Sequence, residues 1–111
     1  MMEISSKKHV NINLVQVSGR LDAGSSPDLE KELVSLLESG EKDFLLDFAE
    51  LDYISSVGLR VLLMAAKKAK AAGGKIVLNS LREHVHEVFE IAGFTAIFPI
   101  FSDRDEALGS Y

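Results

Sequence analysis

The stretch LDFAELDYISSVGLRVLLMAAKKAKAAGGKIVL, residues 46–78, contains the end of one apolar run, a long helical pattern and a second apolar run. Two serines and a glycine, Ser55, Ser56 and Gly58, stand where the first run gives way to the helical pattern. The spacing predicts a helix over residues 56–72, ended by two glycines. A strand, a helix and a second strand in this order predict two parallel strands joined by a crossover helix.

The rest of the chain repeats this alternation. Ser26 is predicted to cap a helix that has Pro27 in its first turn, and Ser80 with Glu83 predicts a capping box for another. Pro99 cannot donate a backbone hydrogen bond, which predicts that the last strand lies at an edge of the sheet. The predicted strands are 2–5, 9–19, 43–48, 75–79 and 96–101, and the predicted helices are 25–40, 56–72, 81–93 and 103–110.

Together these patterns predict one α/β domain over residues 1–111, with a single mixed β-sheet of four to five strands and about four helices. Its 47% hydrophobic content is typical of an ordinary globular domain. The chain has no cysteine, which excludes thiolate metal sites and fits a reducing compartment. A net charge of −5 argues against nucleic acid as a partner, and no apolar run is long enough for membrane insertion. We therefore expect a cytoplasmic protein.

The middle helix has two apolar sides, and only one of them is needed for the sheet. The side expected to face the sheet carries Leu59, Leu62, Leu63 and Ala66. The opposite side carries Val57, Arg60, Val61 and Met64. Either another part of the chain covers this second side, or it is an exposed surface for a partner protein. The sequence leaves both interpretations open.

The paired serines at the start of this helix suggest two different roles. A hydroxyl commonly caps a helix by accepting from a free N–H group of the first turn, and one serine is enough for that. The second serine is then free to face solvent at the positive end of the helix dipole, where an added anion is favoured. Phosphorylation there would add about −1.5 to −2 charges to the surface.

Three kinds of catalytic or ligand-binding site fit the sequence poorly. A serine hydrolase could combine Ser56 with His84 or His86, but Ile54 stands where the nucleophile elbow needs glycine. Residues 72–77 lack the glycine spacing of a phosphate-binding loop. The acidic residues Asp47, Glu50 and Asp52 do not supply a defined ligand set. We therefore expect no enzyme activity, no cofactor and no metal.

Three segments in the same order resemble those of the STAS domain family, which includes bacterial anti-sigma factor antagonists and the cytoplasmic tails of sulfate transporters. They are VSGRLDAGSSPDLEKEL (residues 17–33), LLDFAELDYISSVGLRVLL (45–63) and AAGGKIVLNSLREHVHEVFEIAGF (71–94). Each segment is weakly specific by itself, and the three together cover nearly the whole chain. The resemblance implies the family fold.

The resemblance also implies roles for individual residues. In the family's antagonists, the serine two places before the glycine of this loop accepts a phosphate from a kinase that is also the anti-sigma factor. Gly58 sets the register, so Ser56 matches the phosphoacceptor. Ser55 stands where the family has aspartate, and Val57 stands where it has a small or hydroxylated residue. Asp22 matches an acidic residue that the family fold places near the acceptor.

Two functions follow from the resemblance. The first is an anti-sigma factor antagonist that binds an anti-sigma factor serine kinase when unphosphorylated, releases a sigma factor, and is reset by a serine phosphatase. Val57, Arg60, Val61 and Met64 would form its partner-binding surface. The alternative is an interaction or ligand-binding module without phosphorylation, for example a transporter-associated subunit.

Overall fold

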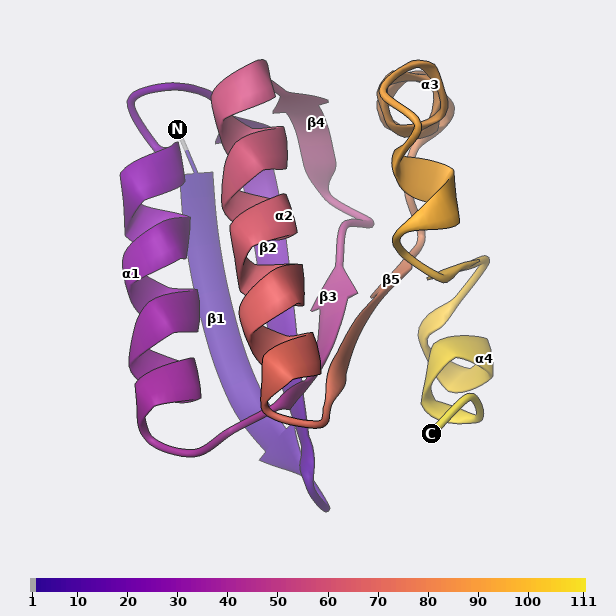
Figure 1. Ribbon diagram of the computed structural model, residues 1–111. Helices are drawn as coiled ribbons and strands as arrows, with labels where there is room; N and C mark the ends of the chain where they lie inside the picture. The colour runs from indigo at the N-terminus through magenta and orange to yellow at the C-terminus, as the bar shows by residue number, and fades with distance from the viewer. Residues whose placement is uncertain (1) are drawn as a thin grey trace.

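The computed structural model describes residues 2–111, whose strands form one mixed sheet (Figure 1). The strands are β1 (Met2–His9), β2 (Ile12–Leu21), β3 (Asp43–Asp47), β4 (Leu51–Ile54), β5 (Lys75–Asn79) and β6 (Ile100–Phe101). Their order is β1-β2-β3-β5-β6, and β4 pairs with β2 beyond the point where β3 ends. β1 and β2 are antiparallel, whereas the other pairs are parallel. The mixed sheet is confirmed, but it has six strands and not four to five.

Four α-helices and one short 3-10 turn complete the fold. They are α1 (Ser26–Glu38), α2 (Ser56–Ala71), α3 (Glu83–Ile91), the 3-10 turn η1 (Phe94–Ala96) and α4 (Arg104–Leu108). Pro27 lies in the first turn of α1, as predicted. No helix within residues 2–111 is long and apolar enough to cross a membrane.

The sheet is covered unequally on its two faces. Alternate residues of β2, β3 and β5 point to opposite sides, as the period of two in a strand requires. The main core includes Val15, Leu46 and Leu78 and packs against α1, α2 and α3, which lie over one face. The smaller cluster of Leu14, Leu45, Val77 and Ala107 packs α4 against the other face. Helices α1 and α2 also pack against each other, side by side over β1 and β2 in Figure 1.

Two of the predicted helix caps are wrong. Ser25 occupies the N-cap position of α1, while Ser26 is the first helical residue and donates its hydroxyl to the Asp22 carbonyl at 2.5 Å. α3 begins at Glu83 with Arg82 at its N-cap, so the capping box of Ser80 does not form. Ser80 instead has a left-handed φ of 63° and donates to the Ser102 carbonyl at 3.2 Å.

The prediction that Val61 lies on an exposed surface is also wrong. Val61 is 5% exposed and belongs to the main core, on a helix that packs against α1. Leu63 and Ala66, expected to face the sheet, are only half-buried. The buried side of α2 is therefore rotated about the helix axis relative to the prediction, because this helix packs against α1 as well as against the sheet.

Replacing Val61 by glutamate tests this rotation. A carboxylate without a partner in the core is strongly unfavourable, so we expect Val61→Glu to lower the free energy of unfolding by about 3–5 kcal/mol. The exposed neighbour Arg60 provides the control, and Arg60→Glu should stay within about 0.5 kcal/mol of the wild type. Urea denaturation measures both. A Val61→Glu protein as stable as the wild type would show that this side of α2 is open to solvent.

Candidate functional site

The cap of α2 is made by the first of the two serines. Ser55 has extended backbone angles, and its hydroxyl accepts from the Gly58 N–H at 3.2 Å. Its own N–H donates to the Leu21 carbonyl at 2.9 Å, which ties the start of the helix to the end of β2. Ser55 is half-buried by these contacts. The capping role expected of one serine therefore belongs to Ser55.

Ser56 is the first residue of α2 and is exposed. Its hydroxyl forms no hydrogen bond with another residue of the described range, 2–111. The first-turn N–H groups and the positive end of the dipole of this 16-residue helix lie beside it. This is the position that the sequence predicts for a hydroxyl accessible to another protein.

Gly58 allows the helix to approach the sheet closely. A Cβ atom at this position would lie 2.9 Å from Leu21 Cγ and 3.0 Å from Ile54 Cγ1, which is closer than carbon atoms normally pack. Leu21 and Ile54 are themselves paired between β2 and β4, and both are buried. The absence of a side chain at Gly58 therefore sets the height of Ser55 and Ser56 above the strand ends.

The turn that follows β2 is held by Asp22. Its carboxylate accepts from the N–H groups of Gly24 and Ser25, each at 3.0 Å, and from the Ser25 hydroxyl at 3.1 Å. These hydrogen bonds, chiefly those from Ser25, hold the pKa of Asp22 below its usual value. The carboxylate is thus ionised and fixed in orientation at neutral pH.

Asp22 and the serines lie at the same edge of the sheet. Leu21 and Ile54 are register partners, so the next residues in each chain segment, Asp22 and Ser55, leave the sheet together. The hydrogen bond from Ser55 N–H to the Leu21 carbonyl spans the same gap. The structure thus brings Asp22 to the loop that carries Ser55, Ser56 and Gly58.

The other predicted partner-binding residues fall into two groups. Arg60 is exposed, whereas Val57 and Met64 are half-buried, and these three recur at helical spacing along one side of α2 together with Ser56. We call Ser56, Val57, Arg60 and Met64 the docking stripe. Val61 does not belong to it, because it points into the core.

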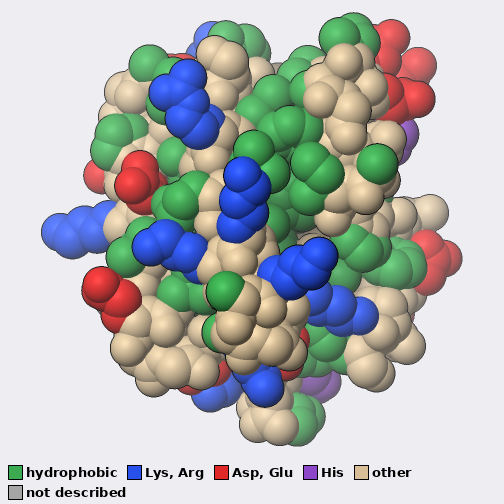
Figure 2. Space-filling model, viewed as in Figure 1, with side chains coloured by type: hydrophobic (Ala, Val, Ile, Leu, Met, Phe, Trp, Pro, Cys, Tyr) green, Lys and Arg blue, Asp and Glu red, His purple; other side chains and the backbone are tan. Residues whose placement is uncertain are grey.

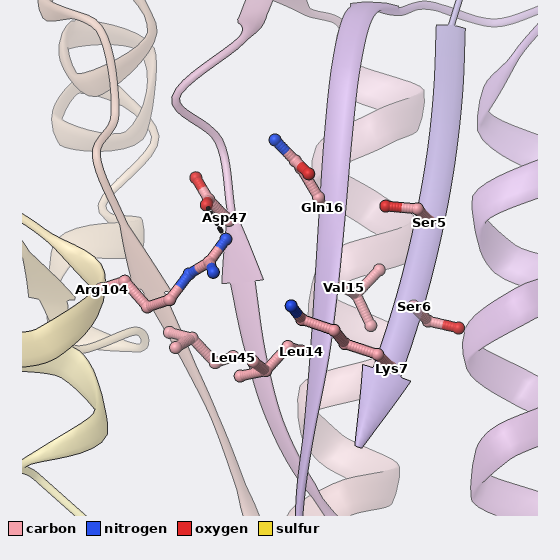
Figure 3. Close-up of a pocket in the computed structure, with 9 residues that line it drawn as sticks. All are labelled: Ser5, Ser6, Lys7, Leu14, Val15, Gln16, Leu45, Asp47 and Arg104. Carbon is pink, nitrogen blue, oxygen red and sulfur yellow. Dashed lines mark hydrogen bonds and ion pairs between the residues drawn. The ribbon is translucent and has the colours of Figure 1, made fainter. Parts of the chain in front are cut away.

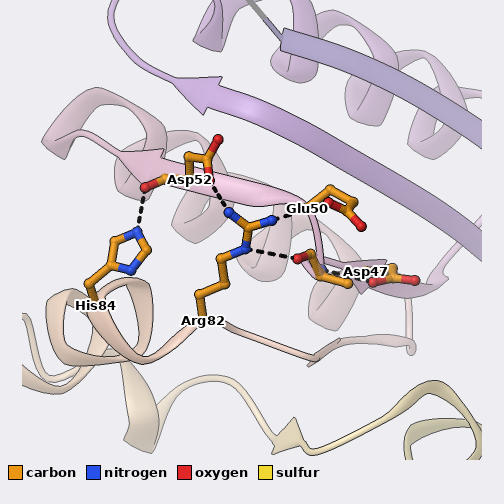
Figure 4. Close-up of polar contacts among 6 residues, drawn as sticks. Asp47, Glu50, Asp52, Arg82 and His84 are labelled. Carbon is orange, nitrogen blue, oxygen red and sulfur yellow. Dashed lines mark hydrogen bonds and ion pairs between the residues drawn. The ribbon is translucent and has the colours of Figure 1, made fainter.

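Sequence reasoning missed Arg82, which joins α3 to β4 (Figure 4). Its guanidinium donates to the Ala49 carbonyl at 3.0 Å and to Glu50 at 3.1 Å, and it also pairs with Asp52. Glu50 and Asp52, considered above as possible cation ligands, thus surround a guanidinium group. A signal for this pairing is absent from the local sequence, because Arg82 is 30 or more residues away from both acids.

Both histidines considered for catalysis form polar contacts with residues other than Ser56. His84 Nε2 lies 2.6 Å from the Asp52 carbonyl, and His86 Nδ1 lies 3.0 Å from a carboxylate oxygen of Glu90. His84 therefore helps to join α3 to β4, and His86 pairs with a neighbour on the surface of α3.

The remaining acid, Asp47, borders a hollow on the opposite face of the sheet (Figure 3). This hollow has a volume of about 270 Å³ and includes Lys7, Gln16 and Leu45 in its lining. The Arg104 guanidinium donates to Asp47 at 2.9 Å, while the other carboxylate oxygen accepts from the Ala49 N–H. Asp47 and Arg104 neutralise each other, so the lining charge that remains is Lys7, which forms no ion pair within residues 2–111.

A cation–π contact beside the site also escaped sequence reasoning. The Arg20 guanidinium carbon lies 4.2 Å from the centre of the Tyr53 ring, which is 39% exposed. The two residues are register partners on β2 and β4. Their proximity could not be predicted, because β4 itself was not predicted.

The fold and the site together define a small α/β domain that presents a serine at a helix N-terminus. The family model for the STAS domain matches residues 3–107, and the chain belongs to this family. A Bordetella bronchiseptica protein named "Putative anti-sigma factor antagonist BtrV" is 38% identical over 110 residues, which cover 99% of this chain and 95% of that protein. The anti-sigma-B factor antagonist of Bacillus subtilis is 31% identical over 99 residues, covering 89% and 90% of the two chains.

Among solved structures, the phosphorylated form of the Bacillus cell fate determinant SpoIIAA matches this chain with a TM-score of 0.78. The match covers 97% of this chain and 98% of that chain at 15% sequence identity. At this identity the likeness concerns the fold alone.

Adding a methyl group at Gly58 tests the close approach of α2 to the strand ends. The contacts with Leu21 and Ile54 predict that Gly58→Ala lowers the free energy of unfolding by about 1–3 kcal/mol, although alanine favours a helix by itself. Gly24→Ala is the control, since its Cβ would meet only Asp22 Oδ1 at an ordinary 3.5 Å. Thermal and urea unfolding measure the stability of both variants. A Gly58→Ala protein more stable than Gly24→Ala would contradict the packing argument.

The lowered pKa of Asp22 predicts a dependence of stability on pH. The carboxylate is favoured in the folded state, so its contribution is fully present above the unfolded-state pKa of about 3.9 and is lost as the pH falls through the folded-state pKa. Asp22→Asn cannot titrate. The stability difference between wild type and Asp22→Asn should therefore be constant from pH 7 to 5 and shrink below about pH 4. Urea titrations at several pH values measure this difference in the free energy of unfolding. A difference that stays constant down to pH 2 would contradict the stabilising role of the ionised Asp22 carboxylate.

Proposed function

We propose that this protein is an anti-sigma factor antagonist that acts as a non-catalytic, phosphorylation-controlled binding switch in the cytoplasm. In its unphosphorylated form it binds an anti-sigma factor that is also a serine kinase, and so releases a sigma factor. The proposal rests on the different environments of the two serines. Ser55 caps α2, while Ser56 is exposed at the helix N-terminus. The names of the relatives from Bordetella and Bacillus support the same role.

The docking stripe supplies the contact surface in this proposal. Arg60 offers an exposed charge, and half-buried Val57 and Met64 offer apolar surface, with Met64 the more adaptable of the two. Ser56 lies at one end of the stripe. A kinase bound to the stripe would therefore hold its own target hydroxyl within the interface.

The charge added by phosphorylation is large enough to abolish such a contact. At about 6 Å from a partner carboxylate, each added unit charge costs about 3 kcal/mol at an effective dielectric constant of ~20. That corresponds to roughly a hundredfold loss of affinity. A serine phosphatase would restore binding by removing the phosphate, and neither step requires a change of fold.

A constitutive interaction module is the second candidate, and one observation favours it. The position that is aspartate in the family's acceptor loop is Ser55 here, and its hydroxyl is committed to the Gly58 N–H. A kinase that recognises its substrate by binding this aspartate would find no carboxylate at position 55. In this case the docking stripe would bind one partner permanently, and its affinity would not depend on the charge at Ser56.

Phosphorylation in vitro distinguishes the two candidates. Incubation with the anti-sigma factor kinase and ATP should add one phosphate to the wild type, located at Ser56 by mass spectrometry, and none to Ser56→Ala. Ser56→Asp should weaken binding to the kinase about tenfold to a hundredfold, because one fixed negative charge carries part of the phosphate's repulsion.

Two matched controls accompany this experiment. Ser110→Asp adds the same charge at a half-buried serine near the C-terminus, outside the docking stripe, and should leave the affinity within about twofold. Arg60→Ala should weaken binding if the docking stripe is the interface. Modification at a different residue, or equal affinity of wild type and Ser56→Asp, would refute the switch, and the second result would favour the constitutive module.

A further inference from the structure

A groove runs along the side of α2 that faces away from α1, between the helix and the segment that follows α3. Its volume is about 570 Å³. Figure 2 shows hydrophobic side chains gathered between α2 and the elements to its right, with lysine or arginine side chains at the lower end. The lining residues are Leu63, Ala66, Lys67, Lys70, Gly74, Lys75, Ile76, Ala96, Ile97 and Pro99.

One wall of the groove is a single stripe of α2. Leu63, Ala66, Lys67 and Lys70 follow one another at spacings of i, i+3, i+4 and i+7, so they share one side of the helix. The first two are half-buried and apolar, and the last two are exposed and cationic. The groove is therefore polarised along its length, with an apolar end and a positively charged end.

The opposite wall is held in place by aromatic packing. Ala96, Ile97 and Pro99 line the groove, and their segment is anchored by Phe98, which is 1% exposed and lies 6.0 Å from the Phe94 ring, centre to centre. Ile97 remains 45% exposed, although it is a large apolar residue. The wall is thus fixed, but its apolar surface is not covered by the protein's own chain.

Two of the three lysines are available to a ligand. Lys75 donates to the Ser110 carbonyl at 2.9 Å and its ammonium lies 4.5 Å from the Tyr111 ring centre, so it is committed to the C-terminal segment. Lys67 and Lys70 form no ion pair among residues 2–111. In a protein with a net charge of −5, they place a local positive charge at one end of an apolar groove.

We propose that the groove binds an acyl-chain carboxylate, with the chain against Leu63, Ala66 and Ile97 and the carboxylate at Lys67 and Lys70. The volume lies in the range of small-molecule sites, which are mostly apolar with a few polar groups that fix orientation. From Leu63 to Lys70 the helix rises roughly 10 Å. An extended chain advances roughly 1.2 Å per bond, so this length corresponds to about eight to nine bonds, or a chain close to decanoate.

The site is separate from the docking stripe. Ser56, Val57, Arg60 and Met64 do not line the groove. Ligand binding should therefore be the same for wild type and Ser56→Asp, and the test does not depend on whether the proposed switch is correct.

Isothermal titration calorimetry with sodium decanoate and with 1-decanol tests the proposal. We expect saturable one-to-one binding of decanoate with a negative heat-capacity change, which marks burial of apolar surface. Lys67→Gln/Lys70→Gln should weaken decanoate binding about tenfold or more and leave the affinity for decanol within about twofold. Ala96→Phe should abolish binding of both, because it fills the groove from an exposed position.

Lys68→Gln is the matched control, because Lys68 is exposed on the same helix turn but does not line the groove. It should bind decanoate as the wild type does, and circular dichroism melting checks that every variant is folded. Absence of saturable binding, or equal weakening by Lys68→Gln and the double variant, would overturn the proposal. So would sedimentation showing a dimer that Ala96→Phe dissociates, because a second copy of the chain would then occupy the groove.

Discussion

The contact between Gly58 and the paired ends of β2 and β4 is the constraint on which the site depends. Leu21 and Ile54 fill the space that any side chain at position 58 would need. Their pairing also brings the Asp22 turn and the Ser55 cap to one edge of the sheet. The missing Cβ atom at Gly58 therefore determines how closely the N-terminus of α2 can approach the strand ends.

The sides of α2 differ in burial, and the two proposed binding surfaces lie on separate sides of the helix. Val61, Leu62 and Ala65 are buried between the sheet and α1. The docking stripe follows one exposed side from the N-terminus, and the groove residues follow another toward the C-terminus. Because the helix is one rigid element of 16 residues, surface changes on one side leave the packing of the others intact. This separation would let a single helix contribute to the core and to both proposed surfaces.

Features determined by local chemistry were predictable from the sequence, whereas those determined by distant partners were not. Strand alternation, Pro27 and the two serines indicated the start of α2 correctly, and the order of the strands and α-helices apart from β4. β4 was missed because it has only four residues and pairs with β2, some 30 residues earlier. The helical pattern could not show that α1 covers Val61. The contacts of Arg82 with Glu50 and Asp52 likewise depend on the fold and leave no local signal.

The exposure of Ser56 also ties the proposed control to the medium around the protein. Mobile ions in the surrounding solvent screen exposed charges over a Debye length of about 8 Å at ~0.15 M ionic strength. The repulsion considered above acts over a slightly shorter distance, so it is only partly screened under ordinary conditions. A higher salt concentration would weaken the proposed repulsion, so the affinity that remains after phosphorylation should rise with ionic strength.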